Sequence, residues 1–211
     1  MSASEHPSWT GRLREAAERN LPPDKLLPDR QPAYVSSWTY VFGVATIAAL
    51  VVLTVSGTVL ALEGPDWWHT SGVGRFFNSV HFWGVQLFFF SIVVHLWSKF
   101  LMGAWRGRRR VTWLVGALTF LVAIGTGLTG YALQQNFASQ WITTQAKDGF
   151  NSVGIGAFFN VLNLGQMLTL HVLVLPVAVV GMTVWHVLQV RHTGVVPPYD
   201  AKAEHLGEEE R

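Results

Sequence analysis

The stretch GRFFNSVHFWGVQLFFFSIVVHLWSKFLMG, from Gly74 to Gly103, decides the fold of this chain. It carries no charge between Arg75 and Lys99, which is long enough for a helix to cross the hydrocarbon core of a bilayer. His81 and His95 lie inside it, fourteen residues apart, so on a helix they are separated by about 21 Å along the axis. Each histidine is therefore predicted to lie near one face of the membrane.

A second apolar stretch, Leu168 to Val190, repeats the arrangement with His171 and His186, fifteen residues apart. One intramembrane histidine is explained by a hydrogen bond to a neighbouring helix, whereas four at two matched depths indicate ligands of a bound group. Neutral imidazole is an axial ligand of haem iron, and two such ligands leave no position open for oxygen or substrate. The histidines therefore predict two stacked haems that transfer electrons. The extra residue in this spacing is about 100° of helical rotation, which crossed helices are expected to absorb.

Two further apolar runs, Trp38 to Leu62 and Trp113 to Leu133, complete four predicted spanning helices. Each run contains two glycines fourteen residues apart: Gly43 and Gly57 in the first, Gly116 and Gly130 in the second. Glycine in a membrane helix usually marks close contact with another helix. At these depths, a missing side chain also leaves room for a flat macrocycle to approach the backbone. We expect one glycine of each run at each haem.

The number of basic residues alternates between high and low from one connecting segment to the next. Five Lys and Arg precede the first spanning helix and five lie between the second and third, whereas the other two loops carry one each. Basic loops remain in the cytoplasm, so both termini are predicted to be cytoplasmic. His81 and His171 then lie near the outer face, with Gly57 and Gly130, and the other histidines and glycines lie near the inner face. We expect a multi-pass protein of a bacterial-type plasma membrane.

The composition fits one integral membrane domain, because half of the 211 residues are hydrophobic and only 13% are charged. The chain has no cysteine, so any haem must be held by its iron ligands and by packing. The net charge of +2 gives no reason to expect nucleic acid as a partner. We divide the chain into a cytoplasmic segment (1–37), a four-helix di-haem domain (38–190) and a polar tail (191–211).

Shorter elements are also expected outside the spans. Ser8 to Asn20 has the pattern of an amphipathic helix lying on the membrane surface, and an ordinary solvated helix is the alternative. The proline-rich segment 21–32 is predicted to be a linker. In the long outer connection after the third span, the apolar part from Phe150 to Gly165 is expected to form a surface helix. Pro176 is expected to kink the fourth spanning helix.

Three motifs carry a resemblance to a known family: S-V-H at Ser79–His81, T-W-x-x-G and T-G-Y within Thr112–Tyr131, and L-H-x-x-x-L-P at Leu170–Pro176. The chain resembles the cytochrome b of quinol oxidase complexes of the bc type, from about Tyr34 to Pro198. It is most similar to the short cytochrome b6 form, whose fourth helix has the fifteen-residue histidine spacing.

The resemblance implies an all-α integral membrane fold, a four-helix bundle holding two non-covalent haems b. It also implies quinone or quinol as substrate, and as partners a separate second cytochrome b (subunit IV-like) chain, a Rieske iron–sulfur protein or a c-type cytochrome, in a homodimeric complex. The implied iron ligands are His81, His95, His171 and His186, and the implied haem-contacting glycines are Gly43, Gly57, Gly116 and Gly130.

The chain departs from the family at several positions. Val41 stands where the b6 form has the cysteine that attaches a third haem, so no covalent haem is expected. Asn78, Phe82 and Gln166 stand nearest to the arginines that flank the first and third histidines in the family. This leaves Arg75 as the residue expected to face the carboxylates of the outer haem.

The leading hypothesis is a di-haem cytochrome b subunit that carries electrons across the membrane in a quinol:electron-acceptor oxidoreductase and does not turn over alone. The alternative is a haem b membrane anchor that passes electrons between quinone and a different dehydrogenase, reductase or hydrogenase. It remains open because Gln134–Phe137 replaces the family's P-W-D-Q, which borders the outer quinol site. A structural four-helix subunit without cofactor is disfavoured by the spacing of the histidines.

Overall fold

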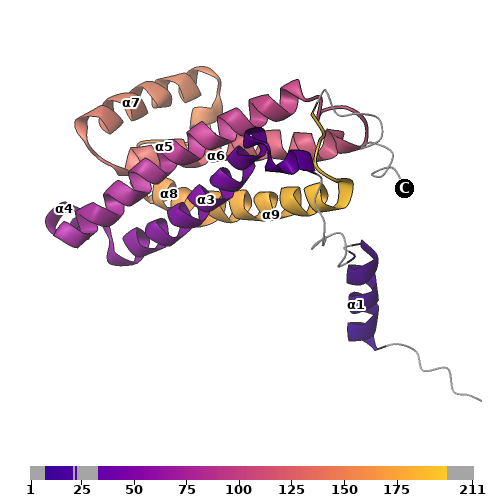
Figure 1. Cartoon of the computed structure of the whole chain (residues 1–211). Coiled ribbons are helices and arrows are strands. Elements are labelled where there is room, and N and C mark those ends of the chain that lie inside the picture. The colour runs from indigo at the N-terminus through magenta and orange to yellow at the C-terminus, as the bar shows by residue number, and fades with distance from the viewer. Residues whose placement is uncertain (1–7, 21, 23–32, 199–211) are drawn as a thin grey trace, which may run out of the picture.

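The computed structural model describes residues 8–20, 22 and 33–198, and every regular element in these ranges is helical. Four helical segments are long and apolar enough to cross a membrane (Figure 1). They confirm the four predicted spanning helices. The segments are α3 (Trp38–Glu63), α5 (Gly72–Leu101), the turn η2 (Gly107–Arg109) with α6 (Arg110–Leu133), and the run of α8 (Leu164–Thr169), η4 (Leu170–Val174) and α9 (Leu175–Thr193).

The spanning helices pack as two pairs, α3 with α5 and α6 with α9. Small residues allow close approach within the first pair, since a Cβ added at Gly84 of α5 would lie 3.1 Å from Leu53 of α3. All four helices meet in one apolar cluster halfway along the bundle. The cluster consists of Ala49, Phe88, Ile92, Ala123 and Val179. It lies midway between the two histidine depths predicted from the sequence.

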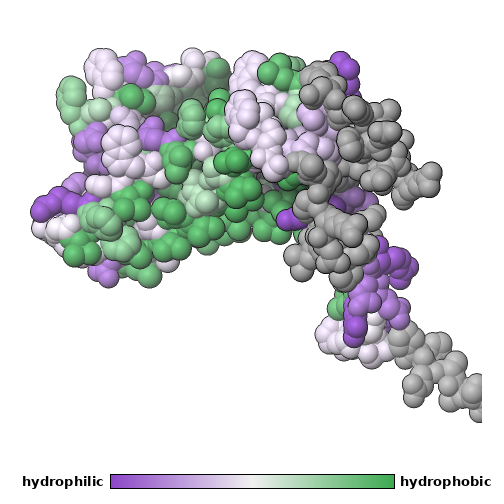
Figure 2. All heavy atoms as spheres, viewed as in Figure 1, coloured by the Kyte–Doolittle hydropathy of each residue, from purple (hydrophilic) through white to green (hydrophobic). Residues whose placement is uncertain are grey.

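The outer surface of the bundle is apolar. In the most apolar window of each spanning helix, only 11 to 22% of the residues are buried inside the protein. Figure 2 shows hydrophobic residues along α3 and hydrophilic ones near α4 (Pro65–Thr70) and on α1 (Trp9–Asn20). Such a surface suits hydrocarbon and not water. The protein is an integral membrane protein.

The fourth spanning segment contains a π-helical turn, η4, which ends two residues before Pro176. Proline has no N–H, so the carbonyl of Val172, four residues earlier, loses its α-helical donor. In η4 the N–H of Leu175 donates instead to the carbonyl of Leu170, five residues earlier. A π turn holds one residue more than an α turn. This turn can accommodate the extra residue between His171 and His186, for which the sequence predicts crossed helices.

The outer connection differs from the prediction. Its helix is α7 (Phe137–Ser152), which begins where the side chain of Asn136 accepts a hydrogen bond from the N–H of Ser139 at 2.9 Å. The apolar part after Phe150 is not a surface helix, because Gly154 has a left-handed backbone (φ 77°) that ends α7. A short 3₁₀ turn, η3 (Ile155–Ala157), follows, and Phe159 packs against a cluster centred on Met167.

The amphipathic helix predicted at the N-terminus is present as α1. Its first turn is capped by Ser8, whose Oγ accepts a hydrogen bond from the N–H of Gly11 at 3.1 Å. Trp9 and Leu13 are 68% and 60% exposed, which leaves an apolar face without partners among the described residues. Attachment of this face to a membrane surface stays a prediction. Most of the linker 21–32 lies outside the described residues.

Residues 194–198, which we call the strap, follow α9 and hold one end of the bundle together. Tyr40 of α3 donates a hydrogen bond from its hydroxyl to the carbonyl of Val196 at 2.7 Å. Arg109, at the start of α6, donates from Nε to the carbonyl of Gly194 at 3.2 Å. The strap therefore joins the two helix pairs at the end that also carries the loop 102–109. We call this end the inner end, following the predicted orientation.

Tyr40→Phe should lower the thermal stability of the protein in detergent by removing one buried hydrogen bond, worth about 1 kcal/mol. The measurement is the midpoint of thermal unfolding, followed by helical circular dichroism. The matched control is Tyr131→Phe, because no hydrogen bond of the Tyr131 hydroxyl is found among the described residues. Equal midpoints for the two variants would show that the strap does not stabilise the bundle.

Candidate functional site

The four intramembrane histidines form two facing pairs between the two helix pairs. His81 of α5 faces His171 of η4, with ring centroids 6.1 Å apart and an angle of 85° between the ring planes. His95 of α5 faces His186 of α9, with centroids 6.4 Å apart and an angle of 86°. The structure thus brings together the residues that the sequence analysis paired.

The separation of the rings suits one iron ion between them. A metal–imidazole bond is about 2 Å long and the ring centroid lies about 1 Å behind the nitrogen, so two ligands on opposite sides of one metal have centroids about 6 Å apart. Both pairs match this distance. The residues therefore fit the axial ligand sets of two haems.

Hydrogen bonds fix the tautomers of the two histidines on the fourth spanning segment. The Nδ1 of His171 lies 2.9 Å from the carbonyl of Thr126, and the Nδ1 of His186 lies 2.9 Å from the carbonyl of Thr112. A carbonyl oxygen only accepts, so each Nδ1 carries the proton. Each Nε2 then has a free lone pair, the form in which imidazole binds a metal.

His81 reaches the same tautomer through a serine. The hydroxyl of Ser56 donates to the carbonyl of Val52 at 2.7 Å and lies 3.0 Å from Nδ1 of His81. Because the single hydroxyl proton is directed to Val52, Ser56 accepts the hydrogen bond from His81. The Nε2 of His81 is therefore also free for a metal.

The inner site contains polar atoms that lack partners. The Nδ1 of His95 is buried without a hydrogen bond among the described residues, as are Nε1 of Trp113 and Oε1 of Gln189. Trp113 lies one turn before Gly116 on α6, and Gln189 lies one turn after His186 on α9. Buried polar atoms of this kind are usually satisfied by ordered water or by a bound group. The inner end thus offers donors and acceptors for a group with polar substituents.

Lys99 adds a cation at the same level. It lies one turn after His95 on α5, and its ammonium lies 3.5 Å from the centroid of the Tyr40 ring. The one ion pair among the described residues, Arg14 with Glu18, is far away in sequence. Lys99 therefore has no carboxylate partner in the described chain, and the carboxylates of a haem are suitable partners.

The four glycines predicted to contact the haems lie against the histidine rings themselves. A Cβ at Gly57 would lie 3.0 Å from Cε1 of His81, and one at Gly116 would lie 2.9 Å from Cε1 of His186. The same holds for Gly43 with His95, at 3.1 Å, and for Gly130 with His171. Each glycine therefore makes room for the imidazole at its own level, and contact of the glycines with a macrocycle stays a prediction.

Several residues of the site were not found from the sequence. Ser56, Thr112 and Thr126 orient the histidines. Thr112 and Thr126 act through their backbone carbonyls, which every residue type has, so the sequence does not distinguish them. Arg75, expected to face the outer haem, is exposed and donates to the carbonyl of His69 at 3.5 Å. Gln134 donates to Asn78 at 3.3 Å, so these two departures from the family pattern contact each other.

Comparisons with known proteins identify the family of the chain. A family model described as cytochrome b (N-terminal)/b6/petB matches residues 86–210. The menaquinol:cytochrome c reductase cytochrome b subunit of Geobacillus thermodenitrificans is 26% identical over 200 residues, covering 83% of this chain and 89% of that protein. Cytochrome b6 of Heliobacterium mobile is 25% identical over 189 residues, covering 79% of this chain and 89% of that protein.

A solved structure has the same fold. A chain of the hyperthermophilic respiratory complex III aligns with a TM-score of 0.68 at 20% sequence identity, over 92% of this chain and 57% of that one. The family match covers more than half of the present sequence, and its residues include three of the four histidines. The chain belongs to the cytochrome b (N-terminal)/b6/petB family.

Proposed function

We propose that this chain is a di-haem cytochrome b subunit that carries electrons across the membrane in a quinol:electron-acceptor oxidoreductase of the bc or b6f type. The observation that carries the proposal is the pair of facing histidine sets, each with the ring separation of two ligands on one iron. The iron of each haem, when bound, supplies reversible one-electron chemistry. The chain's own residues bind the haems and set their depth.

The protein directs the haems toward electron transfer and away from oxygen chemistry. Held between two imidazoles, each iron would have no position left for oxygen or substrate. The histidines of α5 are fourteen residues apart, which corresponds to about 21 Å along the helix. The distance between the two levels is therefore most of the thickness of the hydrocarbon core, which is about 30 Å. The apolar cluster around Phe88 separates the levels. Charge can then cross the membrane within one chain.

The partners follow by analogy with the relatives, whose names include menaquinol:cytochrome c reductase subunits. We expect quinone or quinol as substrate, a Rieske protein or c-type cytochrome, a separate subunit IV-like chain and a homodimeric complex. The alternative is a membrane anchor for a different dehydrogenase, reductase or hydrogenase. It is supported by Gln134–Phe137, where the chain lacks the family's P-W-D-Q and starts α7. Subunit identification after mild purification distinguishes the two.

His95→Leu or His186→Leu should abolish the inner haem and leave the outer one, because leucine has no lone pair for the iron. Pyridine haemochrome analysis of the purified protein should give two haems b per wild-type chain and one per variant. A redox titration should lose one of its two components. One haem per wild-type chain, or a high-spin iron, would contradict the assignment.

Gly116→Leu should weaken inner-haem binding selectively, because any side chain at residue 116 displaces the ring of His186. Overpacking of this kind costs about 1–3 kcal/mol, which corresponds to about 5- to 150-fold weaker binding. Gly125→Leu on the same helix is the matched control, since nothing lies within 4 Å of its added Cβ. Haem occupancy is measured in both variants. If they retain haem equally, Gly116 does not position His186.

The isolated chain should exchange electrons through its haems and show no inhibitor-sensitive quinol:cytochrome c reductase turnover. Bifurcated quinol oxidation needs a proton-accepting carboxylate and a one-electron acceptor at the outer site. The acidic residues of the outer connections are Glu63, Asp66 and Asp148, and none lies in a motif tied to quinol chemistry. Turnover assays on the purified chain, compared with the chain in its native complex, test this. Robust turnover by the single chain would place a complete quinol site within residues 134–165.

A further inference from the structure

The residue before each of the four glycines that lie against the histidine rings differs between the two levels. At the outer level it carries a hydroxyl group and is Ser56 or Thr129. At the inner level it is apolar and is Phe42 or Val115. The two residues of each helix are fourteen positions apart, as the glycines are, so each hydroxyl lies at the depth of the outer histidines. The two levels are therefore built with different side chains next to their histidines.

Ser56 accepts the hydrogen bond of the outer histidine on α5. Its oxygen lies 3.0 Å from Nδ1 of His81 and donates its own proton to the carbonyl of Val52 at 2.7 Å, so the bond to the ring runs from Nδ1–H to Oγ. Ser56 is 2% exposed, so water does not compete for this bond. The ring of His81 is therefore polarised by one buried hydroxyl group.

Thr129 lies against the other outer histidine. Its Oγ1 lies 3.4 Å from Nδ1 of His171, whose nearer acceptor is the carbonyl of Thr126 at 2.9 Å. The Thr129 hydroxyl donates its own proton to the carbonyl of Thr126 at 2.9 Å, so its oxygen also faces the ring as an acceptor. Thr129 thus adds a second, longer contact to a ring that already has an acceptor.

The inner level has no such hydroxyl. The Nδ1 of His95 is buried without a hydrogen bond among the described residues. The position that corresponds to Ser56 is Phe42, whose ring packs edge-on against Phe90 with centroids 6.0 Å apart. The second inner histidine, His186, donates to the backbone carbonyl of Thr112 at 2.9 Å. The ligands of α5 therefore differ: the outer one donates a hydrogen bond from Nδ1 and the inner one does not.

This difference acts on the iron through the imidazole ring. An acceptor at Nδ1–H increases the electron density of the ring and makes Nε2 a stronger donor to a metal. Stronger donation stabilises ferric iron more than ferrous iron, because the ferric ion carries the higher charge. Hydrogen bonding around the ligands of a haem is accordingly one of the means by which a protein sets its reduction potential.

We propose that Ser56, supported by Thr129, lowers the reduction potential of the outer haem by accepting the hydrogen bond of His81. This inference rests on the di-haem function proposed above. Ser56 is a positioning residue, since it acts on the iron only through the ring of His81. The apolar side chain of Phe42 gives His95 no corresponding bond at the inner level.

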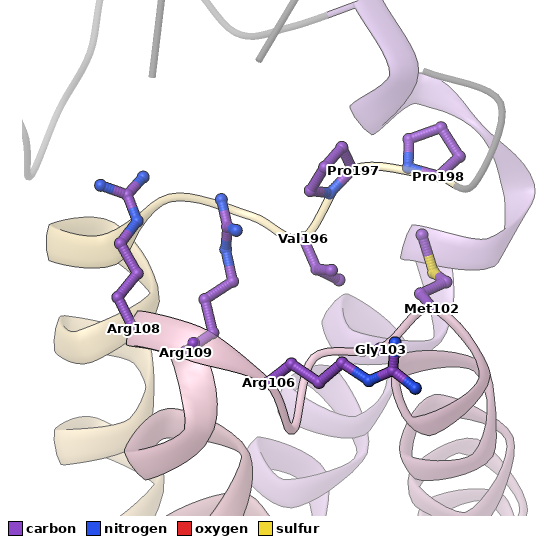
Figure 3. A pocket seen from close by; sticks show the side chains of 9 residues that line it. Met102, Gly103, Arg106, Arg108, Arg109, Val196, Pro197 and Pro198 are labelled. Atoms are coloured by element: carbon purple, nitrogen blue, oxygen red, sulfur yellow. The ribbon is translucent and has the colours of Figure 1, made fainter. Parts of the chain in front are cut away.

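The charged loops also differ between the two ends of the bundle. At the inner end, Arg106, Arg108 and Arg109 line a pocket of about 360 Å³ between the loop 102–109 and the strap (Figure 3). Such charges act on both haems over a distance. They are the same in wild type and in a variant of Ser56. A change of potential in that variant therefore reports the hydrogen bond and not the loops.

The test is a spectroscopic redox titration of the purified full chain carrying His95→Leu, in which the outer haem is the one expected to remain. Adding Ser56→Ala should raise the midpoint potential of this haem. At a fixed potential, the ratio of reduced to oxidised haem should increase about three- to tenfold, which is about 30 to 60 mV for one electron. In the chain with both haems, Ser56→Ala should shift one of the two components.

Two controls separate the hydrogen bond from packing. Ser56→Thr keeps the hydroxyl group and should leave the midpoint close to that of the parent chain. Thr54→Ala removes an exposed hydroxyl of the same helix that donates to the carbonyl of Leu50 at 2.8 Å, and it should cause no shift. Thr129→Val should raise the midpoint by a smaller amount than Ser56→Ala, because its contact with the ring is longer. Thr129→Val therefore also tests the proposal if Ser56→Ala binds no haem.

The count of haems separates this inference from the proposed function. A His95→Leu chain that does not hold one haem would contradict the assignment of the ligands. One haem per chain with an unchanged or lowered midpoint in Ser56→Ala, or in Thr129→Val where Ser56→Ala binds none, would overturn the role of the hydroxyl groups alone. Equal shifts in Ser56→Ala and Thr54→Ala would overturn it as well, since the second hydroxyl does not contact a histidine.

Discussion

An imidazole ring buried among apolar helices must find a partner for both of its nitrogens, and this requirement organises the bundle. In three of the four histidines Nδ1 donates to a group on the neighbouring glycine-containing helix: Ser56 of α3 for His81, and backbone carbonyls of α6 for His171 and His186. The second nitrogen has no such group and is left for a metal. Helix α5 and the fourth spanning segment (η4 and α9) therefore carry the ligands, while α3 and α6 hold them in orientation.

The glycines serve the same requirement. A ring can donate to a backbone carbonyl of the next helix, or to a side chain as short as serine, only if it lies close to that backbone. A Cβ at Gly57, Gly116 or Gly130 would occupy that space. Close packing is thereby concentrated at the two histidine levels and at the apolar cluster between them. The outward faces of the helices are apolar and few of their residues are buried by other helices, as expected for helices whose neighbours are lipids.

The spans and the histidine pairs could be predicted because both depend on the order of residue types along the chain. Uncharged runs and spacings near fourteen are visible in the sequence. The features that were missed depend on hydrogen bonds between distant or unremarkable groups. The π turn at Leu170–Val174 follows from the N–H that Pro176 lacks. The helix of the outer connection was placed too late, because the apolar character of Phe150 to Gly165 was given more weight than the cap at Asn136 and the left-handed Gly154. The strap was not predicted, since its tethers are backbone carbonyls.

The two histidine levels differ in their electrostatic surroundings, and this difference gives the bundle a direction. The inner end carries Lys99, the four arginines from Arg106 to Arg110 and Arg191, with no acidic residue of the described range 33–198 near it. The outer end carries Glu63, Asp66 and Asp148 against Arg75 and Lys147. A positive environment favours the state of a redox centre that holds the additional electron. With haems bound as proposed, the charges of the described range 33–198 would favour the electron at the inner level over the outer one.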